Sequence, residues 1–228
     1  MIVALECAGR VGSIGVLDDA GTVQVCELDG TGSQAAQLLP ALEQLLVEAG
    51  GSLAAVRGII VGEGPGSFTG VRVAAAAGLG LSQALGCPLH RASSLTAALF
   101  GAPELPDAGA HAVLFDARGE RLYLAGYEWR DRRLSVTLSP QFAHVSDMVA
   151  RSFRGLDDAR LCGDGADRHR GVLVAAGFEL AAPGAGRAHA RGLLQLWSEL
   201  PEQVAVWAEG DEPTYLRASS AEREAGLG

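Results

Sequence analysis

Short apolar runs separated by polar turns open the chain and predict three β-strands before the first helix. These runs are Ile2–Glu6, Ser13–Leu17 and Thr22–Leu28. Apolar residues then recur at intervals of three and four from Ala35 to Ala49, which predicts an amphipathic helix. The apolar stretch at residues 56–61 predicts a buried strand, and a glycine-rich loop leads from it into a second predicted helix at residues 68–85.

The same order of elements returns in the second half of the chain. A stretch that contains two prolines and few apolar residues, Gly101 to Gly109, predicts the connection between two lobes. Beyond it, a predicted strand from Ala112 ends on the acid Asp116, as the first strand ends on Glu6. Two strands, a helix, a strand and a helix are then predicted at residues 121–129, 134–138, 145–153, 160–162 and 168–176.

Two consecutive sets of β-β-β-α-β-α elements indicate an α/β protein built by duplication. We predict a first lobe over residues 1–100 and a second lobe over residues 110–228. Two such lobes facing each other describe the actin-like (ASKHA, ribonuclease H-like) architecture that actin, Hsp70 and the sugar kinases share.

Composition excludes several classes of protein. The chain has 228 residues, of which 48% are hydrophobic and 20% charged. Its longest small and apolar run, residues 73–81, is too short for a membrane span of about 20 residues. No basic segment precedes the apolar residues 1–5, which predicts a strand and no signal peptide. The four cysteines are widely spaced and form no C-x-x-C pair, so we predict reduced thiols in a cytoplasmic protein with no membrane partner.

The net charge argues against a chain that binds nucleic acid by itself. The net charge is −9, and neither half of the chain has the excess of positive charge that supplies most nucleic-acid affinity. If RNA is involved, we expect another subunit to hold it. All 18 basic residues are Arg, and the absence of lysine excludes a P-loop lysine, a Schiff-base lysine and a lysine general base.

The loop at residues 64–70, Gly-Pro-Gly-Ser-Phe-Thr-Gly, first suggests a phosphate-binding loop. It lacks the Lys-Ser/Thr pair, and Pro65 removes a backbone donor that a phosphate would need. Ser67 lacks the flanking glycines of a nucleophile elbow, but it is well placed to cap the helix that follows. The small side chains of residues 71–81 suit close approach of another helix. Packing inside the lobe itself is the alternative, and the residues alone favour neither.

The sequence evidence for a catalytic site is weak throughout the chain. Kinases of this architecture place an acid at the end of the first strand, where Glu6 lies, and use glycine turns such as Gly163-Asp164-Gly165 on phosphates. The residues after Glu6 offer few hydroxyl groups for that purpose. No two histidines have metal-ligand spacing, and no local signature supports a catalytic triad, although such groups meet only in space. We predict no catalytic, metal-binding or cofactor-binding residue and no cofactor.

Several short motifs occur in one order along nearly the whole chain. They are Ile2–Glu6, Gln37-Leu38-Leu39-Pro40, Gly64-Pro65-Gly66-Ser67-Phe68-Thr69-Gly70-Val71-Arg72, Ser93-Ser94-Leu95, Asp116-Ala117-Arg118 with Glu120 and Tyr123, and Pro213-Thr214-Tyr215-Leu216-Arg217. Together they resemble the TsaB family, the small non-catalytic partner in bacterial threonylcarbamoyl transfer to tRNA. Members often have Asp followed by Thr or Ser where this chain has Glu6-Cys7, a departure that further weakens a nucleotide site here.

The resemblance implies an actin-like, two-lobed fold that forms a homodimer when alone and pairs with the larger catalytic paralogue TsaD. The ATPase TsaE then acts on the assembled pair, and tRNA is met only through the complex. The catalytic paralogue holds a metal through paired histidines on its first helix. In this chain Gln34 and Leu38 occupy that neighbourhood, and no His occurs before Pro88.

In the family the two helices of the first lobe form the dimer bundle, and here they correspond to the predicted helices at residues 35–49 and 68–85. Carried over, the implied partner interface comprises Leu38, Leu42, Gly64, Pro65, Gly66, Ser67, Phe68, Thr69, Gly70, Arg72, Ala75, Ala76 and Leu79.

Two other functions stay open on the residues. A stand-alone ATP-dependent kinase would fit the same architecture. A peptidase ranks last, because the chain has neither a metal-ligand pair nor a triad signature.

Overall fold

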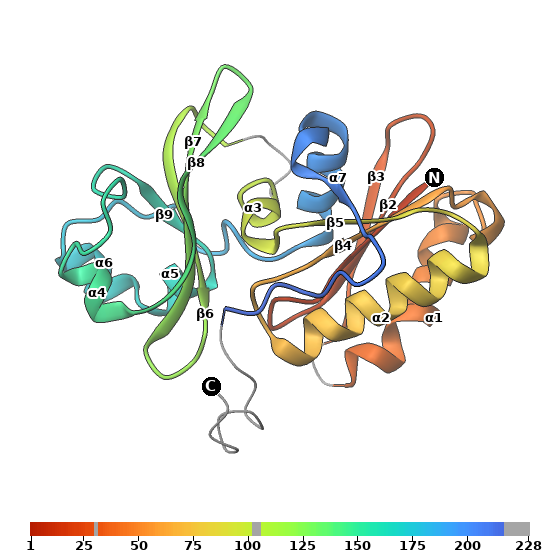
Figure 1. The fold of residues 1–228 in the computed structure, drawn as a ribbon, viewed down its shortest axis with the longest axis horizontal. Coiled ribbons are helices and arrows are strands. Elements are labelled where there is room, and N and C mark those ends of the chain that lie inside the picture. The colour runs from red at the N-terminus through yellow and green to blue at the C-terminus, as the bar shows by residue number, and fades with distance from the viewer. Residues whose placement is uncertain (30–31, 102–105, 217–228) are drawn as a thin grey trace.

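Two β-sheets, one in each lobe, organise the computed structural model, which describes residues 1–29, 32–101 and 106–216 (Figure 1). Within these residues the first sheet has the strand order β10-β5-β4-β1-β2-β3, and the second has the order β8-β7-β6-β9. The strands are β1 Ile2–Glu6, β2 Ser13–Leu17, β3 Val23–Glu27, β4 Gly58–Gly62, β5 Leu89–Ala92, β6 Gly109–Asp116, β7 Arg121–Arg130, β8 Arg133–His144, β9 Arg160–Cys162 and β10 Ala205–Val206.

The helices lie on the faces of these sheets. They are α1 Gln34–Glu48, α2 Phe68–Leu85, α3 Ser94–Leu99, α4 Val145–Val149, α5 Asp164–Arg168, α6 Arg170–Ala175 and α7 Ala190–Glu199, with short 3₁₀ turns at Leu53–Ala55 and Pro201–Gln203.

The two lobes repeat one topology. In the first, β1 pairs antiparallel with β2 and parallel with β4, and β3 pairs antiparallel with the outer side of β2. In the second, β6 pairs antiparallel with β7 and parallel with β9, and β8 pairs antiparallel with the outer side of β7. The predicted duplication and the actin-like fold class are confirmed.

The first sheet is covered on both faces because its strands alternate their side chains between two cores. On one face, Val3 and Leu5 pack with residues of α1, including Leu38 and Leu42. On the other face, Ala4 packs with residues of α3 and α7. Figure 1 shows α1 and α2 below the sheet, while α3 and α7 lie on its opposite side. The outward faces of α1 and α2 therefore point away from the rest of the molecule.

The end of the described chain returns to the first lobe, which differs from the predicted second lobe of residues 110–228. Helix α7 packs on the first sheet through Leu193, Leu194 and Leu196, and β10 pairs antiparallel with β5. The apolar stripe of α7 covers the face that α1 and α2 leave open. This helix was not predicted, and the sheet that it covers depends on contacts between distant residues.

Several other elements differ from the predictions. Strand β5 and helices α3 and α7 were not predicted, and α5 precedes the helix that was expected at residues 168–176. Strand β8 runs to His144, beyond the predicted end at residue 138, because its pairing with β7 continues past an irregularity at Gly126. Helix α4 is shorter than predicted and ends before Arg151, which has a positive φ of 50°. Part of the predicted connection, residues 102–105, lies outside the described residues.

The two lobes share one hydrophobic core through α3, which is buried along its whole length. Phe100, just after α3, meets Trp129 of β7 edge to face, with ring centroids 5.2 Å apart. The hydroxyl groups of Thr96 and Tyr127 lie 3.1 Å apart in a buried hydrogen bond. Because close-packed interiors resist deformation, this shared core holds the lobes in one relative orientation.

Candidate functional site

The loop at residues 64–70 joins β4 to α2 and is held by hydrogen bonds, two of them to neighbouring segments of the lobe. Ser67 caps α2 as predicted, because its Oγ accepts a hydrogen bond from the Gly70 N–H at 3.3 Å. The Ser67 N–H donates to the Ala8 carbonyl at 2.8 Å, and the Gly64 N–H donates to Ser94 Oγ at 3.2 Å. These amides are engaged within the protein, so the loop positions a helix and does not present them as a phosphate cradle.

Two glycines of this loop allow α2 to approach the end of β1. A Cβ added to Gly66 would lie 2.5 Å from the Ala8 carbonyl oxygen, and one added to Gly70 would lie 1.9 Å from that of Cys7. Both distances are far below van der Waals contact, and the obstructing atoms belong to the backbone. The glycine pattern of the loop is therefore explained by packing.

Gly70→Ala is expected to destabilise the protein by about 1–3 kcal/mol, because the new methyl group must displace the backbone of Cys7, just after β1. Gly80→Ala is a matched control in the same helix, since nothing lies within 4 Å of its added Cβ. That change should stabilise the protein by roughly 0.5–1 kcal/mol through helix propensity. Urea unfolding measures both, and equal effects of the two substitutions would contradict the close packing described here.

A groove of about 600 Å³ runs between α1 and α2 on the outer side of the first lobe. Small and apolar side chains form most of its walls, and Arg72 and Thr69 stand at one end. Its lining residues are Ala35, Leu38, Leu39, Phe68, Thr69, Arg72, Val73, Ala76 and Ala77. Large apolar side chains on the same helices are exposed: Leu39, itself a lining residue, by 48%, Val47 by 72% and Leu79 by 40%. An apolar surface of this kind is typical of a protein interface.

The structure corrects part of the predicted interface. Leu42 and Ala75 are buried in their own lobe, with 1% and 6% exposure, so they do not face a partner. Leu38 is 1% exposed and forms the base of the groove. The helical period shows that one face is buried, but it does not tell which face, because small residues occur all around α2.

The remaining predicted residues divide into two groups. Gly64, Pro65 and Gly70 are buried or enclosed within the loop and act by shaping it. The other members reach the surface at least in part, and they are Gly66, Ser67, Phe68, Thr69, Arg72, Ala76 and Leu79. Whether these residues contact a partner stays a prediction.

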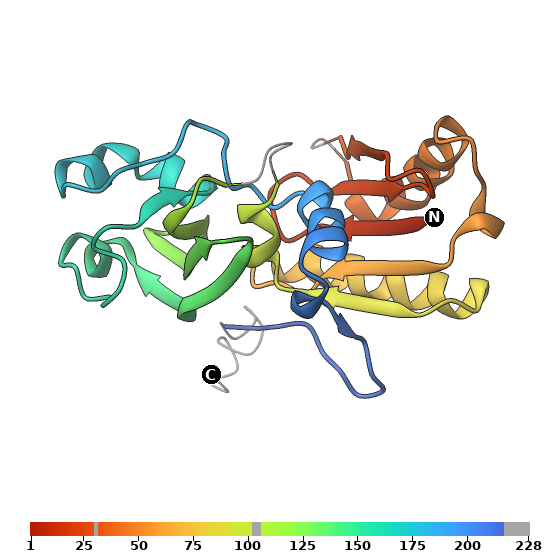
Figure 2. The ribbon, with the colours of Figure 1, turned by 90° about the horizontal axis from the view of Figure 1, so that it is seen from above.

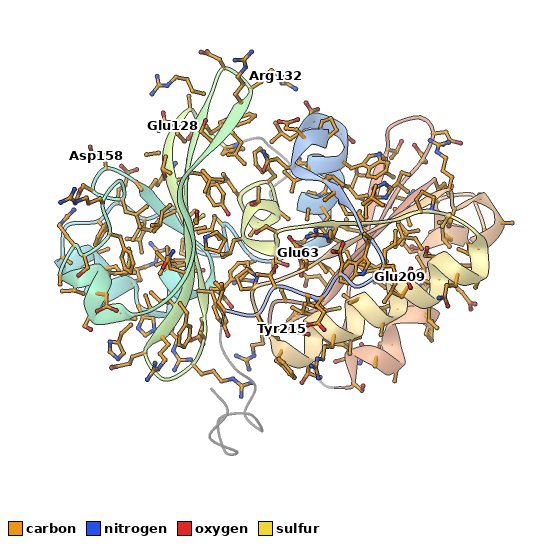
Figure 3. The ribbon with its side chains drawn as sticks, in the orientation of Figure 1. Glu63, Glu128, Arg132, Asp158, Glu209 and Tyr215 are labelled. Atoms are coloured by element: carbon orange, nitrogen blue, oxygen red, sulfur yellow. The ribbon has the colours of Figure 1, made fainter. Side chains whose placement is uncertain are left out.

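An aromatic cluster that the sequence did not predict adjoins the groove, since two of its members, Phe68 and Arg72, line it. Tyr215, labelled in Figure 3, packs against Phe68 with ring centroids 5.1 Å apart. The Arg72 guanidinium lies 4.0 Å from the centre of the Phe68 ring, and its Nε donates to the Tyr215 hydroxyl at 3.1 Å. The motif at residues 213–217 was the available signal, although its final Arg217 lies outside the described residues.

A second and larger hollow, the cleft between the lobes, has a volume of about 1230 Å³. Arg10, Ser67 and Thr69 line it from the first lobe. From the second lobe, Arg168 pairs with Asp116 at 2.7 Å. The cleft is thus lined by both charge signs, and its acids are engaged by neighbouring groups.

The predicted glycine turn of the second lobe also serves packing. A Cβ on Gly163 would lie 2.2 Å from the Leu114 carbonyl oxygen. The carboxylate of Asp164 accepts a hydrogen bond from the Asp116 N–H at 3.1 Å, and burial raises the pKa of Asp164. The turn, which connects β9 to α5, therefore packs α5 closely against the end of β6.

Glu6, the acid at the end of β1, is fully buried and does not line the cleft. Its Oε1 accepts a hydrogen bond from the Ala8 N–H at 2.7 Å, whereas its Oε2 has no hydrogen-bond partner. Burial raises the pKa of the Glu6 carboxyl to about 7, and the hydrogen bond from Ala8 opposes this rise. An acid enclosed in this way is poorly placed to act on a ligand in the cleft.

Within the described part of the chain, no three His, Cys, Asp or Glu side chains gather closely enough to share a metal ion. Across the same residues, no helix combines the length and the apolar character that a membrane span requires.

The duplicated lobes and the cleft between them define a two-lobed protein of the actin-like class. A family model described as TsaD, tRNA N6-adenosine threonylcarbamoyltransferase, matches residues 33–205. The chain belongs to this family.

Two curated relatives are named tRNA threonylcarbamoyladenosine biosynthesis protein TsaB. The one from Escherichia coli strain K12 is 29% identical over 153 residues, which cover 63% of this chain and 64% of the relative. The one from Haemophilus influenzae is 32% identical over 155 residues, which cover 62% of this chain and 65% of the relative. The matches thus span slightly less than two thirds of these relatives.

Solved structures match over nearly the whole chain. YeaZ from Pseudomonas aeruginosa has a TM-score of 0.75 at 29% identity, over 94% of this chain and 99% of that one. A protein described as uncharacterized, with similarity to peptidase YeaZ from Pseudomonas aeruginosa, has a TM-score of 0.77 at 28% identity, over 95% and 99%.

Proposed function

We propose that this chain is a non-catalytic scaffold subunit in the synthesis of threonylcarbamoyladenosine in tRNA, and that it binds a TsaD-like transferase. The observation that carries the proposal is the apolar groove between α1 and α2, which the chain leaves uncovered. A partner with the same fold would bring two helices of its own to such a surface. Helix packing through small residues such as Ala76 permits close approach of the backbones.

The shape of the molecule supports a structural role. Kinases of this architecture close their lobes around a substrate, whereas here α3 joins the lobes into one core. The acid at the end of β1 is buried, and the loop amides of Gly64, Ser67 and Gly70 bond within the protein. The subunit is therefore suited to presenting a fixed surface.

The other partners follow from the same proposal. A TsaE-like ATPase acts on the assembled pair. When the chain is alone, it forms a homodimer through the same groove. With a net charge of −9, the chain leaves the binding of tRNA to the rest of the complex. These reactions take place in the cytoplasm.

Co-expression with the TsaD-like paralogue of the same organism tests the proposal. We expect a stable complex on size-exclusion chromatography, and we expect tRNA modification to require this chain when it is followed by mass spectrometry of nucleosides. Modification at the full rate by the paralogue and its other partners, without this chain, would refute the scaffold role.

A stand-alone ATP-dependent kinase is the second candidate, because the cleft of about 1230 Å³ lies where such enzymes hold ATP between their lobes. Titration calorimetry of the isolated protein with Mg-ATP separates the two functions. The scaffold proposal predicts no heat of binding, while saturable binding followed by phosphate transfer would favour the kinase.

A further inference from the structure

The chain beyond α7 forms a strap, residues 204–216, that runs along the edge of the first sheet toward the second lobe (Figures 1 and 2). Its last residues line the cleft. Its strand β10 pairs with β5 at Ala205 and Val206, and the Trp207 N–H donates to the Leu89 carbonyl at 2.9 Å. Farther along, the Thr214 N–H donates to the Glu63 carbonyl at 2.7 Å. The strap thus links the sheet edge to the start of the loop at residues 64–70.

Few apolar contacts hold the middle of the strap. Val206 is 62% exposed, and Ala208, Glu209 and Gly210 are exposed as well. A segment with little burial opens at low free energy unless specific polar contacts hold it.

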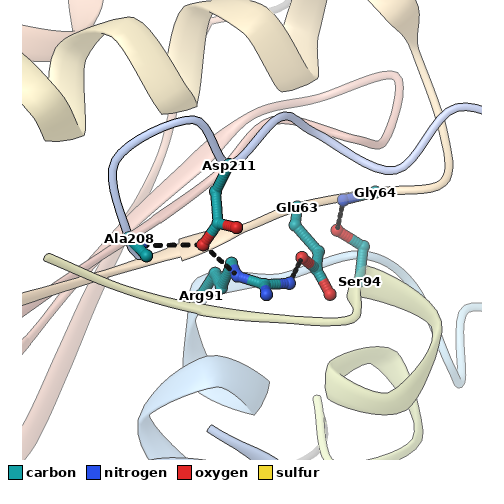
Figure 4. A network of polar contacts seen from close by, with 6 residues as sticks. All are labelled: Glu63, Gly64, Arg91, Ser94, Ala208 and Asp211. Atoms are coloured by element: carbon teal, nitrogen blue, oxygen red, sulfur yellow. Dashed lines mark hydrogen bonds and ion pairs between the residues drawn. The ribbon is translucent and has the colours of Figure 1, made fainter. Parts of the chain in front are cut away.

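Arg91 of β5 supplies those contacts (Figure 4). Its Nε donates to Asp211 Oδ2 at 3.1 Å, and its Nη1 donates to Glu63 Oε2 at 2.5 Å. Asp211 Oδ2 also accepts the Ala208 N–H at 2.7 Å, which closes a tight turn in the strap. The three charged side chains have exposures of only 15–29%, so their attraction is less screened than that of a surface pair. We call these three residues the latch.

The latch lies between the sheet edge and the aromatic cluster at the end of the strap. Past Thr214, Tyr215 packs on Phe68 and accepts a hydrogen bond from Arg72. Phe68 and Arg72 line both the groove and the cleft, while Tyr215 lines the cleft. Tyr215 therefore stands where the two hollows meet.

We propose that the strap is a second element of the partner-binding surface, and that Arg91 is the positioning residue that holds Tyr215 at the end of the groove. This inference rests on the proposed function, and the partner is the same TsaD-like paralogue. Tyrosine and arginine carry much of the binding energy at protein interfaces. The Tyr215–Phe68–Arg72 cluster offers such residues beside an apolar groove, in an arrangement fixed before binding. Preorganisation lowers the entropic cost of association.

Binding of the full-length variants to the TsaD-like paralogue, measured by biolayer interferometry, tests the inference. Tyr215→Ala should weaken binding about 30-fold, as expected for a tyrosine that anchors an interface. Asp211→Asn and Arg91→Gln should each weaken it about 5-fold, because the cluster is then held less firmly. Glu209→Gln is the matched control, since it removes an exposed acid from the same strap (Figure 3) and should leave binding unchanged.

Hydrogen exchange read by mass spectrometry gives an independent measure of the latch. In Asp211→Asn, peptides that contain the Trp207 and Thr214 amides should exchange faster, while peptides of α2 should keep their protection. Addition of the paralogue to the wild-type chain should slow exchange in the strap.

The outcomes separate this inference from the proposed function. If the wild-type chain does not bind the paralogue, the proposed function fails. If the wild-type chain binds and Ala76→Arg does not, but Tyr215→Ala, Asp211→Asn and Arg91→Gln bind like the wild type, the strap inference alone is overturned. Faster exchange in Asp211→Asn with unchanged affinity would likewise overturn the positioning role of the latch.

Discussion

Replacing Ala76 by Arg is expected to weaken binding of the TsaD-like partner by about 100-fold or more, and to abolish the homodimer, while the monomer stays folded. Ala76 is exposed on α2 and lines the groove, so the longer side chain does not disturb the core of the lobe. In the complex, the added charge would be buried against an apolar helix without a partner, which is strongly unfavourable. Sedimentation velocity measures the homodimer, and biolayer interferometry measures the complex.

Two comparisons make this result specific. Val172→Arg places the same charge at an apolar position of α6 that is 51% exposed, and it should bind like the wild type. Ala75→Arg, one residue before Ala76, should instead unfold or strongly destabilise the monomer, because Ala75 is buried. Unchanged association of Ala76→Arg would move the interface to another surface.

Replacing Glu6 by Gln is expected to stabilise the protein by about 2–3 kcal/mol at pH 8, with little effect at pH 4.5. Burial raises the pKa of the Glu6 carboxyl from its ordinary value of 4.5 to about 7 in the folded state. Folding therefore favours the protonated carboxyl, and ionising it in the interior opposes folding. Glutamine has the same shape, keeps an oxygen for the Ala8 N–H and never ionises.

The direction of the pH dependence follows from linkage. The contribution of Glu6 to stability is fully present below pH 4.5 and is lost as the pH rises through about 7. The difference between Glu6→Gln and the wild type should therefore grow across this window. Urea unfolding at several pH values measures it, and Glu43→Gln on the exposed side of α1 controls for removal of one negative charge. A difference that is independent of pH would show that Glu6 keeps an ordinary pKa.

Much of the first lobe could be predicted because its signals are local. The helix at residues 68–85 was predicted with its bounds, since Ser67 caps one end and Gly86 ends the other in the left-handed conformation. Short apolar runs between polar, glycine-containing turns likewise identified β1 to β3. Short elements such as β5 and α3 were missed, because four and six residues are too few to show a clear periodicity.

The candidate site was only partly predictable. The loop and its two helices were identified, but the inward face of α2 was not, since alanine and glycine occur on all its sides. Arg91 lies 120 residues before Asp211 along the chain. No local sequence pattern connects it with Asp211 or Tyr215. Their contacts exist only because β10 pairs with β5.

The sequence by itself determined the order of elements, the duplicated α/β fold class and the absence of lysine chemistry, because each depends on local periodicity or on composition. The tertiary structure alone decided that α7 and the strap return to the first lobe, that Glu6 is buried, and that Ala76 and not Ala75 lines the groove. The physical reason is that burial, electrostatic environment and exposure depend on which distant segments pack together. For this chain, the exposed face of α2 and the latched strap are properties of that packing.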